Sequence, residues 1–265
     1  MKELIIKTKK RVYSLFSGRH LSKLKGSGLD FREIREYSYN EDAKRIDWKI
    51  SAKLQKPMVK EFDENKELNI IILYLLSGSM HFGSVRLKSE LAIEIMSILA
   101  FSAIKNDDKV TFIAYDNKPL HFKPTKSANT AFAYIEQISQ IKLLNRDYDF
   151  YFIDYLNKIK NSILFIISDF YKIPPLHKLK HETYAIKIRD KFEENPKFKG
   201  YINTINPITL NENETFFNAY SIQKHKNYIN NLDKNFNELL NSKRIKHTKI
   251  YTHDDAFFKL GELLK

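Results

Sequence analysis

The chain of 265 residues contains no cysteine, only seven glycines and only seven prolines. The absence of cysteine excludes disulfides, thiolate metal sites and cysteine nucleophiles together, and it fits a reducing compartment. The scarcity of glycine and proline excludes a collagen-like or linker-dominated chain. Because 43% of the residues are hydrophobic, the chain can bury a substantial core, and the composition indicates a globular protein.

The sequence also lacks a long apolar run. The longest, residues 70–76, has seven residues, whereas a membrane-spanning helix needs about 20. The N-terminal stretch is charged and has none of the apolar character of a secretory signal. We therefore expect no transmembrane segment and a cytoplasmic location.

Acidic residues are scarce near the N-terminus. Residues 1–25 contain eight lysines and arginines but one acid, Glu3, and so contribute +7 to the net charge of +13. Such an arm can attract nucleic acid or an anionic membrane surface. The simpler interpretation is a lysine-rich composition, and we favour it because no recognisable nucleic-acid-binding module accompanies the charge.

From residue 67 onward, predicted strands alternate with predicted helices. The expected strands are 68–76, 109–115, 163–167, 184–188 and 248–252, and the expected helices are 86–105, 128–141, 149–160, 224–242 and 256–264. This alternation predicts an α/β fold with a mostly parallel central sheet and helices on both faces. Residues 190–222 interrupt this alternation, and we expect a hairpin insertion there. For residues 1–66 we expect an irregular extension that packs on the main domain.

Two polar loops follow strands of the predicted sheet. One contains Ser77 and Ser79, and the other contains Asp169. Functional groups of such sheets gather at the carboxyl ends of the strands, so we expect these three side chains to lie close together. His81 is the one histidine that falls beside this crevice, and a loop histidine is a commoner interpretation than a catalytic base.

This pair of loops resembles the von Willebrand factor type A fold, whose metal-ion-dependent adhesion site reads Asp-x-Ser-x-Ser after the first strand. Leu75 stands where that site has its aspartate, while Ser77, Ser79 and Asp169 match it. The family also supplies a threonine from a middle loop, and the sequence leaves Thr125 and Thr130 open. With the carboxylate lost at Leu75, we expect a degenerate site, no bound metal and no cofactor, although the resemblance alone would allow Mg²⁺.

A second block, upstream, resembles the family called domain of unknown function 58. The matching residues are Gly26, Gly28, Phe31, Arg35, Tyr37, Asp42, Arg45, Asp47, Trp48 and Lys49. The sequence departs from the family pattern at Asn40, Glu41 and Lys53. The resemblance implies an intracellular bacterial or archaeal protein with a type A domain, and a MoxR-type AAA+ ATPase as its partner.

The charges of this block are balanced, which allows two interpretations. An internal ion-pair network would hold Arg35, Asp42, Arg45 and Asp47 at least partly buried, with Trp48 packed on the main domain. A partner-recognition surface would leave these side chains exposed. We favour the ion-pair network because unpaired burial of charges is costly.

Enzyme signatures are missing: the sequence has no HExxH, no G-x-S-x-G and no P-loop. We therefore predict a non-enzymatic protein-interaction adaptor without a stable nucleic-acid partner. The alternative is a protein that binds nucleic acid or an anionic membrane surface through its basic N-terminal arm.

Overall fold

The computed structural model describes residues 1–264 apart from 20–28, 40 and 65–67. The chain forms two compact units, which are described separately below. The larger unit contains Met1–Ser14 and Leu68–Lys265, and the smaller contains Leu15–Glu67. The sequence predicted a boundary after residue 66; the smaller unit ends at Glu67, and the first 14 residues belong to the larger unit.

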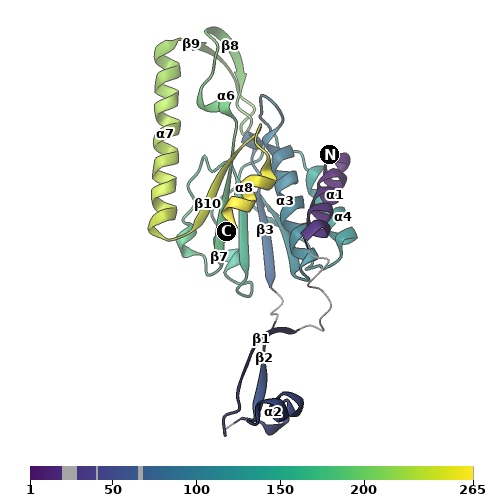
Figure 1. The fold of residues 1–265 in the computed structure, drawn as a ribbon. Coiled ribbons are helices and arrows are strands. Elements are labelled where there is room, and N and C mark those ends of the chain that lie inside the picture. Colours follow the sequence, from purple (N-terminus) through teal and green to yellow (C-terminus); the bar gives the residue numbers. More distant parts are fainter. Residues whose placement is uncertain (20–28, 40, 65–67, 265) are drawn as a thin grey trace. The chain divides into compact units, whose positions relative to one another are not determined.

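The larger unit is built on a six-stranded sheet with the order β10-β7-β6-β3-β4-β5 (Figure 1). The strands are β3 (Asn69–Leu75), β4 (Lys109–Tyr115), β5 (Pro119–His121), β6 (Ile163–Ser168), β7 (Glu182–Arg189) and β10 (Lys246–Tyr251). All neighbours pair in parallel except β5, which is antiparallel to β4. The mostly parallel α/β architecture predicted from the sequence is confirmed.

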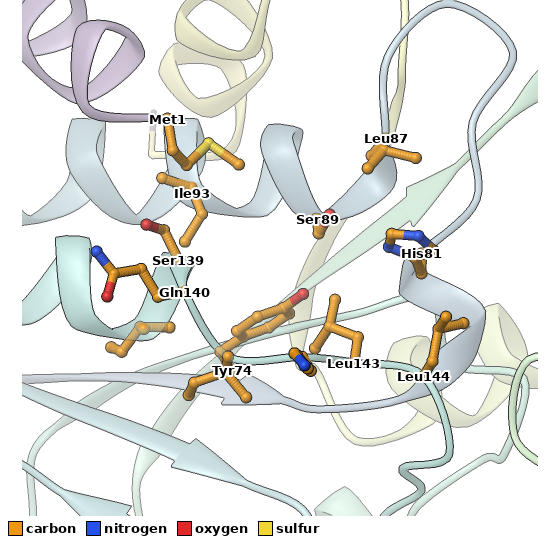
Figure 2. A pocket seen from close by; sticks show the side chains of 13 residues that line it. Met1, Tyr74, His81, Leu87, Ser89, Ile93, Ser139, Gln140, Leu143 and Leu144 are labelled. Carbon is orange, nitrogen blue, oxygen red and sulfur yellow. The ribbon is translucent and has the colours of Figure 1, made fainter.

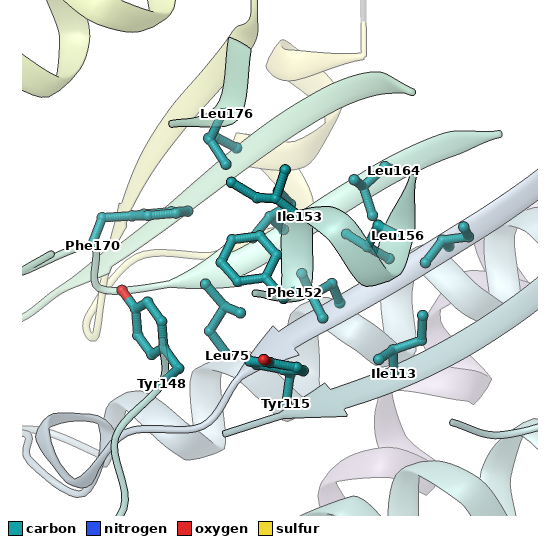
Figure 3. Close-up of a cluster of buried hydrophobic side chains, with 14 of the residues drawn as sticks. Leu75, Ile113, Tyr115, Tyr148, Phe152, Ile153, Leu156, Leu164, Phe170 and Leu176 are labelled. Carbon is teal, nitrogen blue, oxygen red and sulfur yellow. The ribbon is translucent and has the colours of Figure 1, made fainter. Parts of the chain in front are cut away.

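One face of the sheet is covered by α5 (Phe152–Leu156) and α7 (Ala219–Ser242). Side chains that alternate along β3, such as Leu73 and Leu75, pack there with Phe152 and Phe236. Figure 3 shows Leu75 and Phe152 in this cluster. This alternation follows from the period of two in a strand. Every residue of β3 from position 70 onward is buried, because helices cover both faces.

The other face carries α3 (Lys88–Lys105), α4 (Ala128–Ser139) and α8 (Ala256–Leu263). The N-terminal helix α1 (Lys2–Arg19) also belongs to this unit over its first 14 residues. Its Ile5, Thr8 and Val12 are buried, at a spacing that places them on one side of a helix. This part of the basic segment is therefore a packed helix.

The insertion between β7 and α7 contains the short helix α6 (Lys191–Glu194) and an antiparallel hairpin of β8 (Gly200–Ile205) and β9 (Glu212–Phe217). A β-hairpin therefore lies within the segment for which the sequence predicted one. The turn of the hairpin contacts the segment between α4 and α5, because Asn145 N donates to Pro207 O over 2.9 Å. A Cβ atom on Gly78 would lie only 2.0 Å from Pro207 O, so this contact requires glycine.

The smaller unit is more regular than the sequence suggested. Strands β1 (Leu29–Glu36) and β2 (Met58–Glu64) form an antiparallel pair, joined through a 3-10 turn (Ala43–Arg45) and the helix α2 (Trp48–Leu54). The register shifts between Phe31 and Glu33, as at a β-bulge. The expectation of an irregular N-terminal extension is wrong for these elements.

Candidate functional site

The loop after β3 places two hydroxyl groups at the carboxyl edge of the sheet. Ser77 caps a 3-10 turn (Gly78–Met80), and its Oγ lies 2.8 Å from Oγ of Ser79. Gly78 N donates to Arg146 O over 2.9 Å, which ties this loop to the segment before α5. Strands that follow β3 in the chain lie on both of its sides, so this edge is the point at which an open sheet offers a crevice.

Asp169 follows β6 and lies at the same carboxyl edge of the sheet. Its carboxylate accepts a hydrogen bond from the Ser79 hydroxyl and another from Lys88 Nζ at 2.9 Å. The structure thus brings together the three residues Ser77, Ser79 and Asp169, and it adds Lys88 from the first turn of α3. The side chains of Lys88 and Asp169 are 0% and 1% exposed, respectively.

Lys88 also joins the crevice to the insertion. Its Nζ lies 2.5 Å from Oε1 of Glu193 in α6. Burial by itself raises the pKa of Asp169, but Lys88, Ser79 and Arg189 together hold that pKa below its ordinary value. Burial raises the pKa of Glu193, and Lys88 offsets only part of that increase. One buried ammonium therefore serves two carboxylates from different segments.

The donor set beside Asp169 matches an ammonium better than a divalent metal ion. Mg²⁺ is bound through several oxygens, with carboxylates supplying negative charge. Here the negative charge of Asp169 already faces Lys88. Within the described part of the chain, no group of three His, Cys, Asp or Glu side chains is arranged to hold a metal ion. Leu75 is fully buried in the core on the α5 and α7 face (Figure 3).

The two threonines considered for the middle loop lie at the opposite end of the sheet. Thr125 pairs with Val110 near the start of β4, whereas the crevice adjoins Tyr115 at its end. Thr130 follows in the first turn of α4, where its N–H donates to the capping Ser127. The expectation that one of these threonines completes the site is therefore wrong. His81 is exposed and lies just after the 3-10 turn.

A second charged cluster adjoins the first. Asp233 of α7 accepts hydrogen bonds from Lys187 Nζ at 2.8 Å, Arg189 Nη2 at 3.0 Å and Lys249 Nζ at 2.8 Å. The ring of Tyr171 separates the two clusters, with Lys88 Nζ 5.2 Å and Arg189 Cζ 4.2 Å from its centroid. These contacts fasten α7 and the end of β7 to the crevice.

Sequence reasoning missed Lys88, Arg189 and Asp233, although a signal was present. Lys88 lies within the predicted helix 86–105, and Arg189 directly follows the predicted strand 184–188. A charged residue on a buried face must find a partner or shift its pKa. Such positions are therefore candidates for internal ion pairs.

In the smaller unit, the block that resembles the family is stabilised by helix caps and ion pairs. Arg35 Nη1 lies 2.8 Å from Glu41 Oε1, and Tyr37 Oη donates to Glu41 O over 2.6 Å. Asp42 caps the 3-10 turn by accepting from Lys44 N. Phe31 lies in β1, while Gly26 and Gly28 fall outside the described residues.

Asp47 caps α2 and also pairs with Lys60 over 2.6 Å. The Lys60 hydrogen bond and those from the Ile50 and Lys49 amides hold the pKa of Asp47 below its ordinary value. Asp47 and Arg35 are partly buried, as expected, but Asp42 and Arg45 are exposed, which contradicts the expectation for these two. Lys49 is exposed as well, and Trp48 is 69% exposed. The packing of Trp48 on the main domain remains a prediction, because the two units are described separately.

Two curated relatives share part of the sequence. They are "Uncharacterized protein Rv1480" of Mycobacterium tuberculosis and "Uncharacterized protein Mb1516" of Mycobacterium bovis, each 26% identical over 102 residues. The match covers 38% of this chain and 32% of each relative. The chain thus matches about a third of the length of these curated proteins.

Solved structures with a similar chain trace include the conserved hypothetical protein BatB from Bacteroides thetaiotaomicron. It has 13% sequence identity and a TM-score of 0.46, and the match covers 74% of this chain and 96% of that one. An aerotolerance-related membrane protein from Bacteroides fragilis has 14% identity and a TM-score of 0.44, with 74% and 98% covered. In the chain with this sequence, none of the helices over the described residues is long and apolar enough to span a bilayer.

A family model that covers most of the chain shows the family to which the chain belongs. The model described as "Protein of unknown function DUF58" matches residues 33–223, which include much of the upstream block, the crevice and the insertion. The chain belongs to the DUF58 family of proteins of unknown function.

Proposed function

We propose that the protein is a non-enzymatic adaptor whose smaller unit presents a partner-binding surface. The observation that carries this proposal is the exposure of Trp48 within its own unit, between the exposed Arg45 and Lys49 of the family block. Tryptophan and arginine are enriched among the residues that dominate binding energy at protein interfaces. A large aromatic side chain left 69% exposed beside two cations is a typical anchor for a partner.

The larger unit, in this proposal, is a von Willebrand factor type A-like domain without a metal ion or cofactor. Lys88 supplies the positive charge beside Asp169, and the hydroxyls of Ser77 and Ser79 complete the polar lining. The charged groups described in this crevice, Lys88, Asp169 and Glu193, are paired with one another and buried. This supports a binding role over catalysis.

The proposed partner is a MoxR-type AAA+ ATPase, a class inferred from the family resemblance. A cytoplasmic ATPase requires that both units face the cytoplasm. The alternative, binding of nucleic acid or anionic lipid through the basic arm, receives less support from the contacts of α1. Arg11 pairs with Asp255 over 2.7 Å and Lys9 Nζ bonds Asn129 over 3.3 Å, so these charges face the larger unit.

The test is co-purification of a tagged chain from its native cell, in wild-type form and as Trp48→Ala and Tyr39→Ala. Tyr39 is 98% exposed in the same unit but is not part of the matching block, so it controls for loss of any exposed aromatic ring. We expect an AAA+ protein with the wild type and with Tyr39→Ala, and at least a tenfold loss with Trp48→Ala. Absence of an AAA+ protein from the wild-type sample would refute the partner class, and full retention by Trp48→Ala would refute the surface.

A further inference from the structure

A pocket of about 320 Å³ lies beside the crevice, on the face of the sheet that carries α3 and α4. It is bounded by the N-terminal half of α3, the end of α4 with the loop that follows, and Tyr74 of β3 (Figure 2). Pockets that bind small molecules measure about 300–1,000 Å³ and are mainly apolar with a few polar groups. This pocket falls at the small end of that range.

The walls and one end of the pocket differ in chemistry. Ile93, Ile138 and Leu143 provide apolar walls, and Tyr74, Ser89 and His81 line one polar end. Further polar groups come from the end of α4 and the loop after it, namely Ser139, Gln140 and Lys142. Figure 2 shows the Tyr74 hydroxyl directed toward Ser89 and His81. A ligand with an apolar body and one polar end would match this division.

The hydroxyl of Tyr74 provides the strongest sign of a ligand. Tyr74 is 2% exposed, and its Oη has no hydrogen-bond partner within the described part of the chain. Burial, with a smaller contribution from the charge of Asp169, raises the pKa of Tyr74, so the phenol is neutral and can donate its proton. A buried hydroxyl without a partner costs free energy, which a ligand oxygen would recover.

A second donor group lies at the same end. Ser89 belongs to the first turn of α3. The backbone N–H groups of Lys88, Glu90 and Leu91 in this turn already donate to Phe82 O and Leu87 O, so the donor that Ser89 brings to the pocket is its hydroxyl. Both the phenol and this hydroxyl can donate to an oxygen acceptor. A full negative charge is less suitable, because Glu90 already occupies this first turn and Asp169 lies close enough to influence Tyr74.

We propose that this pocket binds a small, uncharged, apolar carbonyl compound, whose oxygen accepts the Tyr74 O–H and whose body packs against Ile93, Ile138 and Leu143. The proposal is independent of the adaptor function. It assigns a ligand class to a site distinct from the buried Lys88 ion pairs.

The experiment is a nuclear magnetic resonance titration of the full chain, labelled at its Ile and Leu methyl groups. The probes are acetophenone, its isostere α-methylstyrene, which replaces the carbonyl oxygen by CH₂, and benzoate, which carries a charge. We expect shifts of the Ile93, Ile138 and Leu143 methyl signals, and about fivefold to tenfold tighter binding of acetophenone than of α-methylstyrene or benzoate. In Tyr74→Phe the preference for acetophenone over α-methylstyrene should vanish.

Each outcome decides the proposal. No methyl shift with millimolar acetophenone would refute the site. Equal affinity of acetophenone and α-methylstyrene for the wild type would refute the role of the carbonyl, and this comparison needs no variant. Tighter binding of benzoate would refute the uncharged class. Retention of the acetophenone preference in Tyr74→Phe would refute the assignment of the donor.

Discussion

The ammonium of Lys88 lies 2.9 Å from the carboxylate of Asp169, although 81 positions separate the two residues in the sequence. Both side chains are shielded from water, and Glu193 shares the same ammonium. A buried pair of this kind contributes little net stability compared with apolar side chains, but removing one partner leaves an uncompensated charge. The conformations of the three segments that carry Lys88, Asp169 and Glu193 therefore depend on the Lys88 side chain.

Replacing Lys88 by Met is expected to destabilise the larger unit by about 3–5 kcal/mol at pH 7, because two buried carboxylates lose their cation. The difference in the free energy of unfolding between the variant and the wild type should become smaller toward pH 4. In the variant, burial raises the carboxyl pKa values above those of the unfolded chain, so the variant gains stability as pH falls. In the wild type, the lowered pKa of Asp169 gives stability that is lost as pH falls.

Urea unfolding followed by far-ultraviolet circular dichroism measures this effect. Tryptophan fluorescence reports only on the smaller unit, because Trp48 is the sole tryptophan. The exposed Lys118 provides a matched control, and Lys118→Met should stay within about 0.5 kcal/mol of the wild type. A Lys88→Met protein as stable as this control at pH 7 would contradict the role given to the pair.

Magnesium should not stabilise the wild-type protein. A ligand present at 100 times its Kd adds about 2.7 kcal/mol to the free energy of unfolding. With Lys88 beside Asp169, we expect no change in melting temperature with millimolar Mg²⁺, measured by scanning calorimetry against the same concentration of a salt without divalent ions. A dose-dependent rise specific to Mg²⁺ would show that the cation competes with the ammonium.

The second cluster predicts an alkaline pH effect. Burial lowers the pKa of Lys187 to about 8, and Asp233 offsets this only in part. Between about pH 8 and pH 10 the unfolded chain keeps a proton that the native Lys187 has lost, so this group makes stability rise with pH. Lys187→Met should remove that contribution, whereas Lys234→Met, at an exposed position of α7, should retain it. Denaturant unfolding at pH 7.5, 8.5 and 9.5 compares the slopes, and identical slopes for all three proteins would rule the effect out.

The contact of Gly78 with the hairpin turn is tested by Gly78→Ala. The added Cβ meets Pro207 O at 2.0 Å, so the turn or the loop must move, and we expect a loss of about 1–3 kcal/mol. Gly261→Ala is the control, since its Cβ meets nothing within 4 Å in α8, where alanine should add about 0.5–1 kcal/mol. Limited proteolysis should also cut within residues 206–211 faster in Gly78→Ala. Equal stability of the two variants would show that the turn adapts without cost.

Two buried tyrosines on adjacent strands differ in their hydroxyl groups. That of Tyr115 has a hydrogen-bond partner, whereas that of Tyr74 has none within the described part of the chain. Tyr115 is as buried as Tyr74, but its Oη donates to Asp149 over 2.6 Å. Tyr115→Phe should lower the free energy of unfolding by about 1 kcal/mol or more, whereas Tyr74→Phe should leave it unchanged or raise it. Thermal and urea unfolding of both variants provide the measurement. A larger loss for Tyr74→Phe than for Tyr115→Phe would mean that the Tyr74 hydroxyl has a partner.

The fold was predictable where one periodicity dominated the sequence. The apolar residues of β3 and the nearly all-apolar α3 define the buried sheet and its covering helix without knowledge of distant contacts. The β1–β2 pair was missed because its register shifts between Phe31 and Glu33, and a bulge interrupts the alternation by which a strand is recognised. Charged residues in both strands also favoured the prediction of an irregular segment.

The residues of the crevice were predictable only in part, and the physical reason differs from that for the β1–β2 pair. Loops after parallel strands must meet at one edge, so Ser77, Ser79 and Asp169 were assigned to one place correctly from topology. Lys88 enters from the start of a helix and Glu193 from an insertion, and neither position follows from the order of strands. Their pairing depends on long-range packing, which sequence spacing does not encode.

The division of the chain has a consequence for binding. The smaller unit is joined to the larger unit at both of its ends, because residues 1–14 and 68–265 belong to the same body. Closing a segment into a loop restricts the volume that it can explore, compared with a segment attached at one end. A partner that contacts both units therefore meets the second at a raised effective concentration, and two weak contacts can combine into a tight one without any additional interface.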